Sequence, residues 1–329
     1  MKEGVYLVTG ASGFIGSNVV RLLVDRGVRV RAMVRDPRKS ADLEKLGVPV
    51  VIADLRDASS LSRAVEGARG VFHIASLFRR AGLPESVFHD VNAEGVRRLF
   101  DAAIGAGVER LVHCSTVGVL GHIENPPATE DSPYNPGDMY QRSKLSGEKI
   151  ALEYLRSGRM KGVVIRPTMV YGPGDTRNLK MFRMVARRCW FYVGDGETKV
   201  HFVDVRELAR AFLLAMEKEE RNGEVYLVVG PKAVSQKVMA DRIASELGVP
   251  RPWLHLPVKP MQWLGSLCEA ICMPLKIPPP IYRRRVDFFT KHREFSGEKA
   301  ARDLGFRPAK TFEEEIVEIT RWYREHGWI

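Results

Sequence analysis

Cysteine is scarce in this chain and is not arranged for a structural role. Four cysteines occur among 329 residues, at Cys114, Cys189, Cys268 and Cys272. Their spacing matches neither a disulfide framework nor a zinc site. Cys268 and Cys272 fall on one face of an expected helix, where cysteine ordinarily serves as a packing residue. The sequence therefore predicts a fold that depends on its apolar core rather than on covalent bridges.

Other absences narrow the class of protein. The first strand-like run starts almost at Met1 and leaves no room for a signal peptide, so we expect a cytoplasmic protein. The apolar stretch Met261 to Leu275 is too short to span a bilayer. The net charge of +11 comes from scattered basic residues, and no nucleic-acid-binding module accompanies them. We therefore do not expect nucleic acid as a partner.

No metal site is expected either. The histidines lie in strand or strand-end contexts without a second ligand at a suitable spacing; they are His73, His113, His89, His201 and His292. A serine-hydrolase elbow, a Walker phosphate loop and a paired-carboxylate motif are likewise missing. The chemistry must come from other residues.

A glycine-rich turn near the N-terminus provides the first positive signal. The apolar run Val5–Thr9 leads into Gly10-Ala11-Ser12-Gly13-Phe14-Ile15-Gly16, and a helix is predicted to follow. Glycines permit a tight turn and a close approach of phosphate to the free N–H groups at a helix start. The GxxGxxG spacing differs from the plain GxGxxG fingerprint, so this turn indicates a dinucleotide site by analogy.

A tyrosine and a lysine four residues apart provide the second signal. Tyr140 and Lys144 share one face of a predicted helix, which places an ammonium group beside a phenol. We expect the ammonium to lower the pKa of Tyr140, which is otherwise about 10. A phenol tuned in this way can exchange a proton with a carbonyl or carbinol oxygen.

The order of strands and helices predicts an α/β fold. Near-continuous apolar runs are typical of parallel strands covered on both faces; they span residues 5–9, 28–34, 49–53, 70–75, 110–115 and 162–166. Helical patterns lie between them, at residues 18–26, 59–66, 92–106 and 140–157. We predict a Rossmann-type doubly wound parallel sheet, with the reactive groups beyond the carboxyl ends of its strands.

The composition and periodicity of the chain change near residue 170. Proline and glycine become frequent, and residues 250–280 show no long periodicity. We predict a dinucleotide-binding domain over residues 1–170, to which residues 201–220 cross back. A smaller substrate-binding lobe is predicted over residues 171–329.

These motifs together resemble the extended short-chain dehydrogenase/reductase family. That family includes nucleotide-sugar epimerases, dihydroflavonol-type reductases and 3β-hydroxysteroid dehydrogenases. The resemblance covers nearly the whole chain and includes five further segments: Ala53–Asp57, His73–Ser76, Asn92–Gly95, Arg166–Gly174 and His201–Val205. It implies binding of an NAD-type cofactor by residues of the glycine turn and of these segments. The implied residues are Gly10, Ser12, Gly13, Phe14, Ile15, Gly16, Asp54, Leu55, Ala75, Asn92, Tyr140, Lys144 and Pro167.

The same resemblance implies a catalytic triad. Tyr140 would be the general acid/base, and Lys144 would bind the nicotinamide ribose. Aligning Val119-Leu120-Gly121 with a family motif places Thr116 at the position of the catalytic serine or threonine, with Ser115 as its neighbour near the substrate.

The residues after the second strand favour NADP(H). The strand-end position that carries a carboxylate in NAD sites is Val34, and Arg35 follows it, with Arg38 and Lys39 within reach. A guanidinium suits the ribose 2′-phosphate. NAD(H) stays open, because Asp36 could instead face the ribose.

The second lobe carries features of two substrate classes. Asn178 and Lys199 lie where sugar-nucleotide enzymes often bind a diphosphate, and Arg283 could join them. The apolar stretch with Trp263, followed by Tyr282 and Arg283, instead favours an apolar pocket or contact with a membrane surface. We expect residues 261–291 to fold over the nicotinamide end of the site. A homodimer is left open.

We therefore predict an NADP-dependent oxidoreductase that interconverts a secondary alcohol and a ketone on a lipophilic alicyclic substrate, such as a sterol or steroid. The alternative is a nucleotide-sugar epimerase or dehydratase that holds NAD tightly. A third reading, a non-catalytic redox-sensing or assembly subunit, does not explain why Tyr140, Lys144 and a hydroxyl partner are all present.

Overall fold

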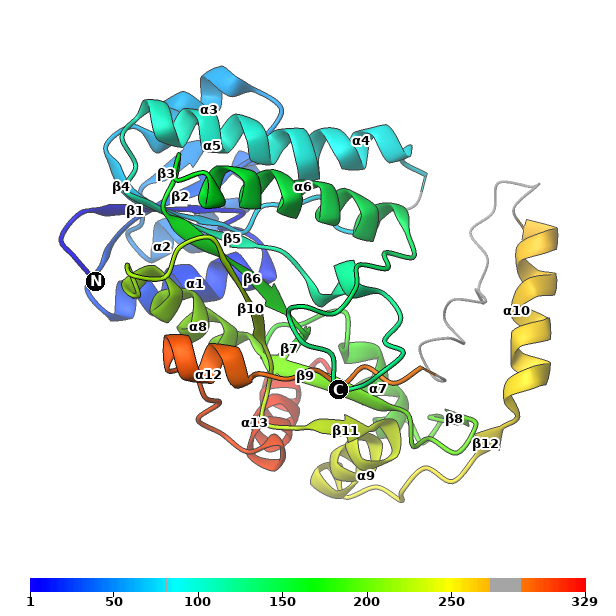
Figure 1. Cartoon of the computed structure of the whole chain (residues 1–329). Helices are drawn as coiled ribbons and strands as arrows, with labels where there is room; N and C mark the ends of the chain where they lie inside the picture. Colours follow the sequence, from blue (N-terminus) through cyan, green and yellow to red (C-terminus); the bar gives the residue numbers. More distant parts are fainter. Residues whose placement is uncertain (81, 273–290) are drawn as a thin grey trace.

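A parallel sheet of seven strands forms the centre of the fold in a computed structural model that describes residues 1–80, 82–272 and 291–329 (Figure 1). The strand order is β10-β6-β5-β4-β1-β2-β3, and each neighbouring pair is parallel. The bounds are β1 Val5–Thr9, β2 Arg29–Val34, β3 Val50–Ile52, β4 Ala68–His73, β5 Arg110–Cys114, β6 Gly162–Pro167 and β10 Glu224–Val228. The predicted Rossmann-type fold is confirmed.

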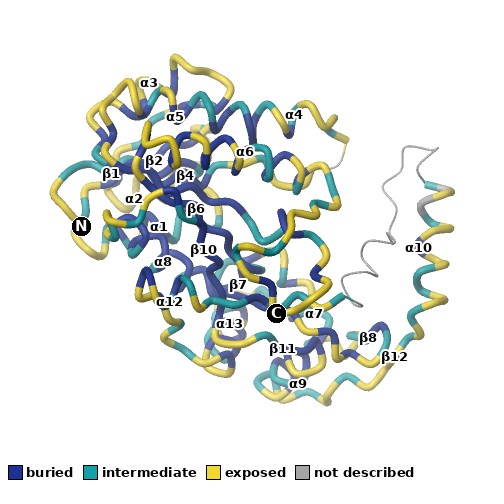
Figure 2. Tube along the Cα trace, in the orientation of Figure 1, coloured by how far each residue is buried: buried dark blue, intermediate teal, exposed yellow. Residues whose placement is uncertain are grey.

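Helices cover both faces of this sheet, and an apolar cluster lies between each helical layer and the strands (Figures 1 and 2). One layer consists of α3 (Ala58–Val65), α5 (Gly95–Gly105) and α6 (Met139–Arg156). The other contains α1 (Phe14–Asp25) and α8 (Val205–Glu217), which pack against each other. Two short helices, α2 (Ala41–Lys45) and α4 (Glu85–His89), lie in the connections. Covering on both faces explains why the strands are near-continuously apolar.

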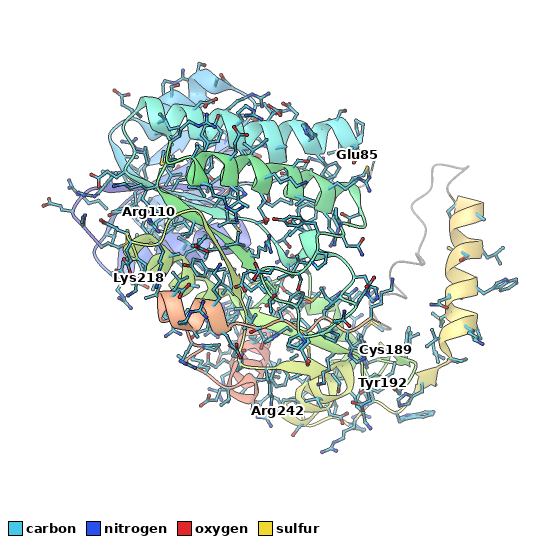
Figure 3. The ribbon with its side chains drawn as sticks, in the orientation of Figure 1. Glu85, Arg110, Cys189, Tyr192, Lys218 and Arg242 are labelled. Carbon is cyan, nitrogen blue, oxygen red and sulfur yellow. The ribbon has the colours of Figure 1, made fainter. Side chains whose placement is uncertain are left out.

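The seventh strand was not predicted. β10 pairs with β6, although the sequence analysis placed its residues in the second lobe. Helix α12 (Glu298–Leu304) also packs on the main sheet, through Ala300 and Leu304. Arg110, labelled in Figure 3, joins the start of β5 to α8 and to the loop before β10. Its buried guanidinium donates to the carbonyls of Ala215 and Arg221. The division at residue 170 remains a proposal. The main sheet also contains β10, which lies beyond the predicted crossing at residues 201–220.

The second lobe is built on a small sheet with the order β11-β9-β7. Its strands are β7 Met169–Tyr171, β9 Lys199–Asp204 and β11 Ala233–Ser235; its helices are α7 Leu179–Ala186, α9 Gln236–Leu247 and α13 Phe312–Glu325. A short pair, β8 Tyr192–Val193 and β12 His255–Leu256, leads to α10 (Val258–Cys272), which stands at the edge of the molecule (Figure 1). Among the described residues, no helix is both long and apolar enough to cross a membrane.

A buried carboxyl group couples α13 to the small sheet and makes stability depend on pH. The Tyr171 hydroxyl donates to Glu315 at 2.5 Å, and the Glu315 side chain is fully buried. Burial raises the pKa of Glu315 to about 8, against 4.5 for an exposed carboxyl group. The folded state therefore binds this proton more tightly than the unfolded state. Its contribution to stability is complete below pH 4.5 and is lost as the pH rises through about 8.

We expect Glu315→Gln to remove this dependence. In denaturant unfolding, the free energy of unfolding of the wild type should fall relative to that of Glu315→Gln as the pH rises from 4.5 to 8. Glu325→Gln, which changes an exposed carboxylate at the end of the same helix, is the control and should follow the wild type. Parallel curves for wild type and Glu315→Gln would contradict the assignment.

Candidate active site

A single large cavity brings most of the predicted site residues together. Its volume is about 1990 Å³, and it extends from the carboxyl ends of the main strands into the second lobe. We call the part lined by Gly10–Gly16, Met33–Lys39 and Ala53–Leu55 the nucleotide arm. The apolar arm is the part lined by Met169, Met181, Met184, Trp190, Phe191, Phe202, Met261 and Phe295. Tyr140, Lys144, Ser115 and Thr116 also line the cavity.

The glycine turn at the nucleotide arm has no space for a Cβ at Gly10 or Gly16. Gly10 has a φ of 68°, and a Cβ there would lie 2.8 Å from the Cα of Ala75. A Cβ on Gly16 would lie 2.2 Å from the carbonyl oxygen of Gly10. No side chain caps the start of α1, so its first N–H groups are suited to a phosphate. These residues fit the pyrophosphate of an NAD-type cofactor.

Tyr140 and Lys144 lie on α6 as predicted, but their electrostatics differ from the prediction. Both side chains are buried. Burial raises the pKa of Tyr140 above its ordinary value, with the guanidiniums of Arg79 and Arg177 acting against this shift. The Lys144 ammonium donates to the Cys114 carbonyl at 2.7 Å. The predicted lowering of the Tyr140 pKa by Lys144 is therefore wrong for this structure, because loss of solvation outweighs the nearby positive charges.

The two hydroxyl groups after β5 are used differently. Thr116 Oγ1 accepts the N–H of Gly118 at 3.0 Å, which starts a 3₁₀ turn over Val117–Leu120. This bond does not use the hydroxyl hydrogen, which can point to the cavity that Thr116 lines. Ser115 Oγ instead donates to Glu148 at 2.5 Å. This arrangement favours Thr116 over Ser115 as the group that contacts a substrate.

An ion pair that the sequence analysis missed lies directly behind these residues. Glu148 and Arg166 are 0% and 1% exposed, and their side chains approach to 2.6 Å. The hydroxyl of Tyr134 lies between them, donating to Glu148 at 3.0 Å and lying 2.9 Å from Arg166 Nη2. Glu148 follows Lys144 by four residues, so Tyr140, Lys144 and Glu148 share one face of α6. This four-residue spacing was the signal in the sequence that could have identified Glu148 as part of the site.

The adenosine end of the nucleotide arm contains both charges considered for cofactor choice. Arg35, Lys39 and Asp36 line it. The Asp36 carboxylate accepts two hydrogen bonds from the Arg38 guanidinium, at 2.9 and 3.0 Å, and one from its N–H. This pairing lowers the pKa of Asp36. Asp36 is therefore occupied by Arg38, while Arg35 is exposed at the cavity.

Two residues of the predicted cofactor set do not line the cavity. Arg38 is held by Asp36, and its side chain is 87% exposed. Asn92 is buried, where its amide bonds both the N–H and the carbonyl of Leu77 and also Ser143. It thereby joins the loop after β4 to α6. The remaining members of the set all line the cavity.

The structure does not bring the predicted substrate residues together at the cavity. Asn178 lines the cavity, but its amide donates to Asp175 at 2.6 Å. Lys199 does not line it and instead pairs with Glu294 at 3.1 Å. Trp263 is 72% exposed on α10, so it does not present its ring to the site as expected. Tyr282 and Arg283 lie outside the described residues.

The residues that line the apolar arm were mostly missed, apart from the general expectation of an apolar pocket. They come from α7, β7, β9, the turn before β8, α10 and the segment before α12, which share no local motif. On α10, Met261 faces the cavity while Trp263, Leu264 and Leu267 remain exposed, so contact of this helix with a membrane surface stays a prediction. No group of three or more histidine, cysteine or acidic residues suited to a metal ion occurs in the described part of the chain.

Comparisons with known proteins agree with this geometry. Residues 6–229 match the NAD dependent epimerase/dehydratase family. The chain is 32% identical to sterol demethylase protein B of Methylococcus capsulatus, over 98% of this chain and 99% of that protein. It is 28% identical to a 2-alkyl-3-oxoalkanoate reductase of Stenotrophomonas maltophilia, over 94% and 96%. A dTDP-glucose 4,6-dehydratase of Streptomyces venezuelae, solved with NAD bound, is 25% identical with a TM-score of 0.77 over 98% of each chain.

The buried pair behind the site should be essential for stability. Glu148→Ala leaves the Arg166 guanidinium buried without its counter-ion, and we expect the free energy of unfolding to fall by about 3–5 kcal/mol. Glu153→Ala is the matched control, because Glu153 on the same helix forms an ion pair with Arg159 and is 57% exposed. Its loss should stay below about 1 kcal/mol. Similar losses for the two variants in urea unfolding would show that burial does not set the value of the pair.

Proposed function

Because the chain belongs to the NAD dependent epimerase/dehydratase family of extended short-chain dehydrogenases/reductases, we propose that it is an oxidoreductase that interconverts a secondary alcohol and a ketone on a lipophilic substrate. NADP(H) is the proposed cofactor, and a sterol-like alicyclic compound is the leading substrate class. One observation carries the proposal: Tyr140, Lys144 and Thr116 line the same cavity as the glycine turn and a methionine-rich apolar arm.

Each catalytic side chain has a role that its position supports. Tyr140 is the proposed general acid/base, and its neutral phenol, maintained by burial, can donate a proton to a ketone oxygen. Thr116 would donate a second hydrogen bond to that oxygen. Lys144, held by the Cys114 carbonyl, would orient the cofactor ribose beside Tyr140. The nicotinamide supplies the hydride acceptor or donor when it is bound.

The apolar arm favours a lipophile over a sugar nucleotide. Methionine side chains at Met169, Met181, Met184 and Met261 adapt to irregular apolar shapes. A ligand buried there gains about 25 cal/mol for each Å² of apolar surface removed from water. A sugar nucleotide would need cations for its diphosphate. Of the candidates named from the sequence, Lys199 is paired with Glu294 outside the cavity, the Asn178 amide donates to Asp175, and Arg283 lies outside the described residues. Because Arg177, Lys180 and Arg293 do line the cavity, the preference for a lipophile rests on the apolar walls.

NADP(H) preference is supported by the charges of the nucleotide arm. Arg35 and Lys39 line the arm, whereas the carboxylate of Asp36 is bonded to Arg38. A guanidinium at this position suits a 2′-phosphate.

We expect Tyr140→Phe to retain the fold and cofactor affinity while turnover falls by about 10²–10⁴-fold, the usual contribution of a general acid/base. Turnover is measured by NADPH absorbance on a panel of sterols, steroids and long-chain ketones. Tyr226→Phe, which removes another buried hydroxyl group from the main sheet, is the control and should remain active.

The same panel, extended to UDP- and dTDP-sugars, decides between the two enzyme classes. Turnover or micromolar binding of a nucleotide sugar, with no response to any lipophile, would refute the proposed substrate class and favour an epimerase or dehydratase. Near-wild-type turnover by Tyr140→Phe would refute its catalytic role.

Arg35→Ala should weaken NADP(H) selectively. A hydrogen bond to a charged group contributes about 1.5–3 kcal/mol, so NADPH affinity should fall about tenfold or more while NADH affinity changes little. Arg29→Ala removes a charge from the other end of β2, where Arg29 pairs with Glu3, and should change neither affinity. Both affinities can be measured by nicotinamide fluorescence. Equal losses for NADPH and NADH would show that Arg35 does not recognise the 2′-phosphate.

A further inference from the structure

We propose that Arg79 is a positioning residue for Tyr140: its guanidinium, fixed over the Tyr140 ring, stabilises the phenolate that accepts a proton when an alcohol is oxidised. Arg79 acts through Tyr140 and needs no contact with the substrate. The inference rests on the proposed oxidoreductase function and concerns how the proton is moved, whatever the substrate is. The sequence motif assigns Lys144 as the cation beside Tyr140, and neither the motif nor the comparisons assign Arg79.

The guanidinium of Arg79 lies over the Tyr140 ring. Its central carbon is 5.3 Å from the centre of that ring and 5.5 Å from the centre of the Phe78 ring. Phe78 packs edge-on against Tyr140, with ring centres 5.0 Å apart, so the three side chains form one cluster. Phe78 and Arg79 belong to the loop after β4, and both line the cavity together with Tyr140. A phenolate shares its negative charge between oxygen and ring, and an opposite charge within about 4–6 Å favours such an ionised form.

An interaction with the start of α6 fixes Arg79 in this place. Its Nε donates to Asp138 Oδ2 at 2.9 Å. The other carboxylate oxygen of Asp138 accepts the N–H of Gln141 at 2.6 Å and thereby caps α6. Asp138 precedes Tyr140 by two residues, so the helix that carries the phenol also holds the guanidinium. Because the Asp138 side chain is only 17% exposed, water competes weakly for this anchor.

The charged and titratable groups that face Tyr140 come from several elements. They are Asp138 and Lys144 of α6 and its cap, Cys114 at the end of β5, Arg79 after β4 and Arg177 of the second lobe. Burial has the largest effect and raises the pKa of Tyr140, and the Cys114 thiol acts in the same direction. Arg79 lowers this pKa more than Arg177 does, and Asp138 opposes them more weakly. Arg79 therefore outweighs its own counter-ion at Tyr140.

Reduction and oxidation need opposite forms of Tyr140. A ketone receives its proton from the neutral phenol, which burial maintains. An alcohol is oxidised when its O–H bond breaks and the proton passes to the phenolate oxygen, while hydride leaves the carbinol carbon for NADP⁺ to give the ketone and NADPH. The phenol then releases this proton to solvent. Because a buried phenolate without a nearby cation is costly, Arg79 makes the basic form of Tyr140 accessible.

The experiment follows the oxidation of a 3β-hydroxysteroid and of a long-chain secondary alcohol by NADP⁺, from about pH 6 to about pH 10. Among variants of the full chain, Arg79→Gln removes the charge and Arg79→Lys keeps it. Arg80→Gln is the control, because Arg80 is an exposed neighbour that does not line the cavity. NADP⁺ affinity and urea unfolding are measured for every variant, so that a loss of cofactor binding or of stability is recognised separately.

For the wild type, kcat/KM for oxidation should rise with pH as the phenolate forms. We expect Arg79→Gln to be about three- to tenfold slower than the wild type at the acidic end and to approach it at the alkaline end. The reason is that Tyr140 then ionises at a pH higher by up to about one unit. Arg79→Lys should recover most of this loss, and Arg80→Gln should follow the wild type.

The same ratio of Arg79→Gln to wild type at every pH would overturn the inference, because a purely structural role lowers activity regardless of the charge on Tyr140. Failure of Arg79→Lys to exceed Arg79→Gln, or an equal loss in Arg80→Gln, would overturn it too. Each of these results leaves the proposed function intact. Oxidation of neither alcohol by the wild type, together with turnover of a nucleotide sugar, would instead refute the proposed function itself.

Discussion

The buried ion pair between Glu148 and Arg166 is the interaction on which the site depends. It joins α6, which carries Tyr140 and Lys144, to the end of β6. Through Ser115 it also holds the end of β5, whose Cys114 carbonyl accepts Lys144. Two charges without access to water are costly to separate. The helix and the strand ends therefore keep their relative positions beside the large cavity.

The cavity combines two kinds of recognition that need different surfaces. At the nucleotide arm, the first N–H groups of α1 have no side-chain cap, and the glycines leave them accessible, so they are suited to a phosphate. At the apolar arm, methionine and aromatic side chains form the walls. This distribution is the reason that the proposed substrate has a large apolar body.

Local patterns predicted the elements that carry the nucleotide arm. β1 has the predicted bounds, because its apolar run is uninterrupted. By contrast, β10 was assigned to the second lobe, since nothing local distinguishes a strand that returns to the main sheet from one that does not. The lowered pKa expected for Tyr140 was wrong for a related reason. Helical spacing indicates a neighbouring charge, but the extent of burial is a property of the whole fold.

The sequence by itself determined the fold class, the glycine turn and the shared face of Tyr140 and Lys144, because each follows from spacing within one or two elements. Only the tertiary structure decided which charged side chains reach the cavity. It paired Asp36 with Arg38, Lys199 with Glu294 and Glu148 with Arg166. It also brought Arg79 and Arg177 to one phenylalanine from opposite lobes. The partners in the second and third pairs are far apart along the chain, so their contacts exist only after the chain has folded. Asp36 and Arg38 lie two residues apart, and the turn after β2 orients them toward each other.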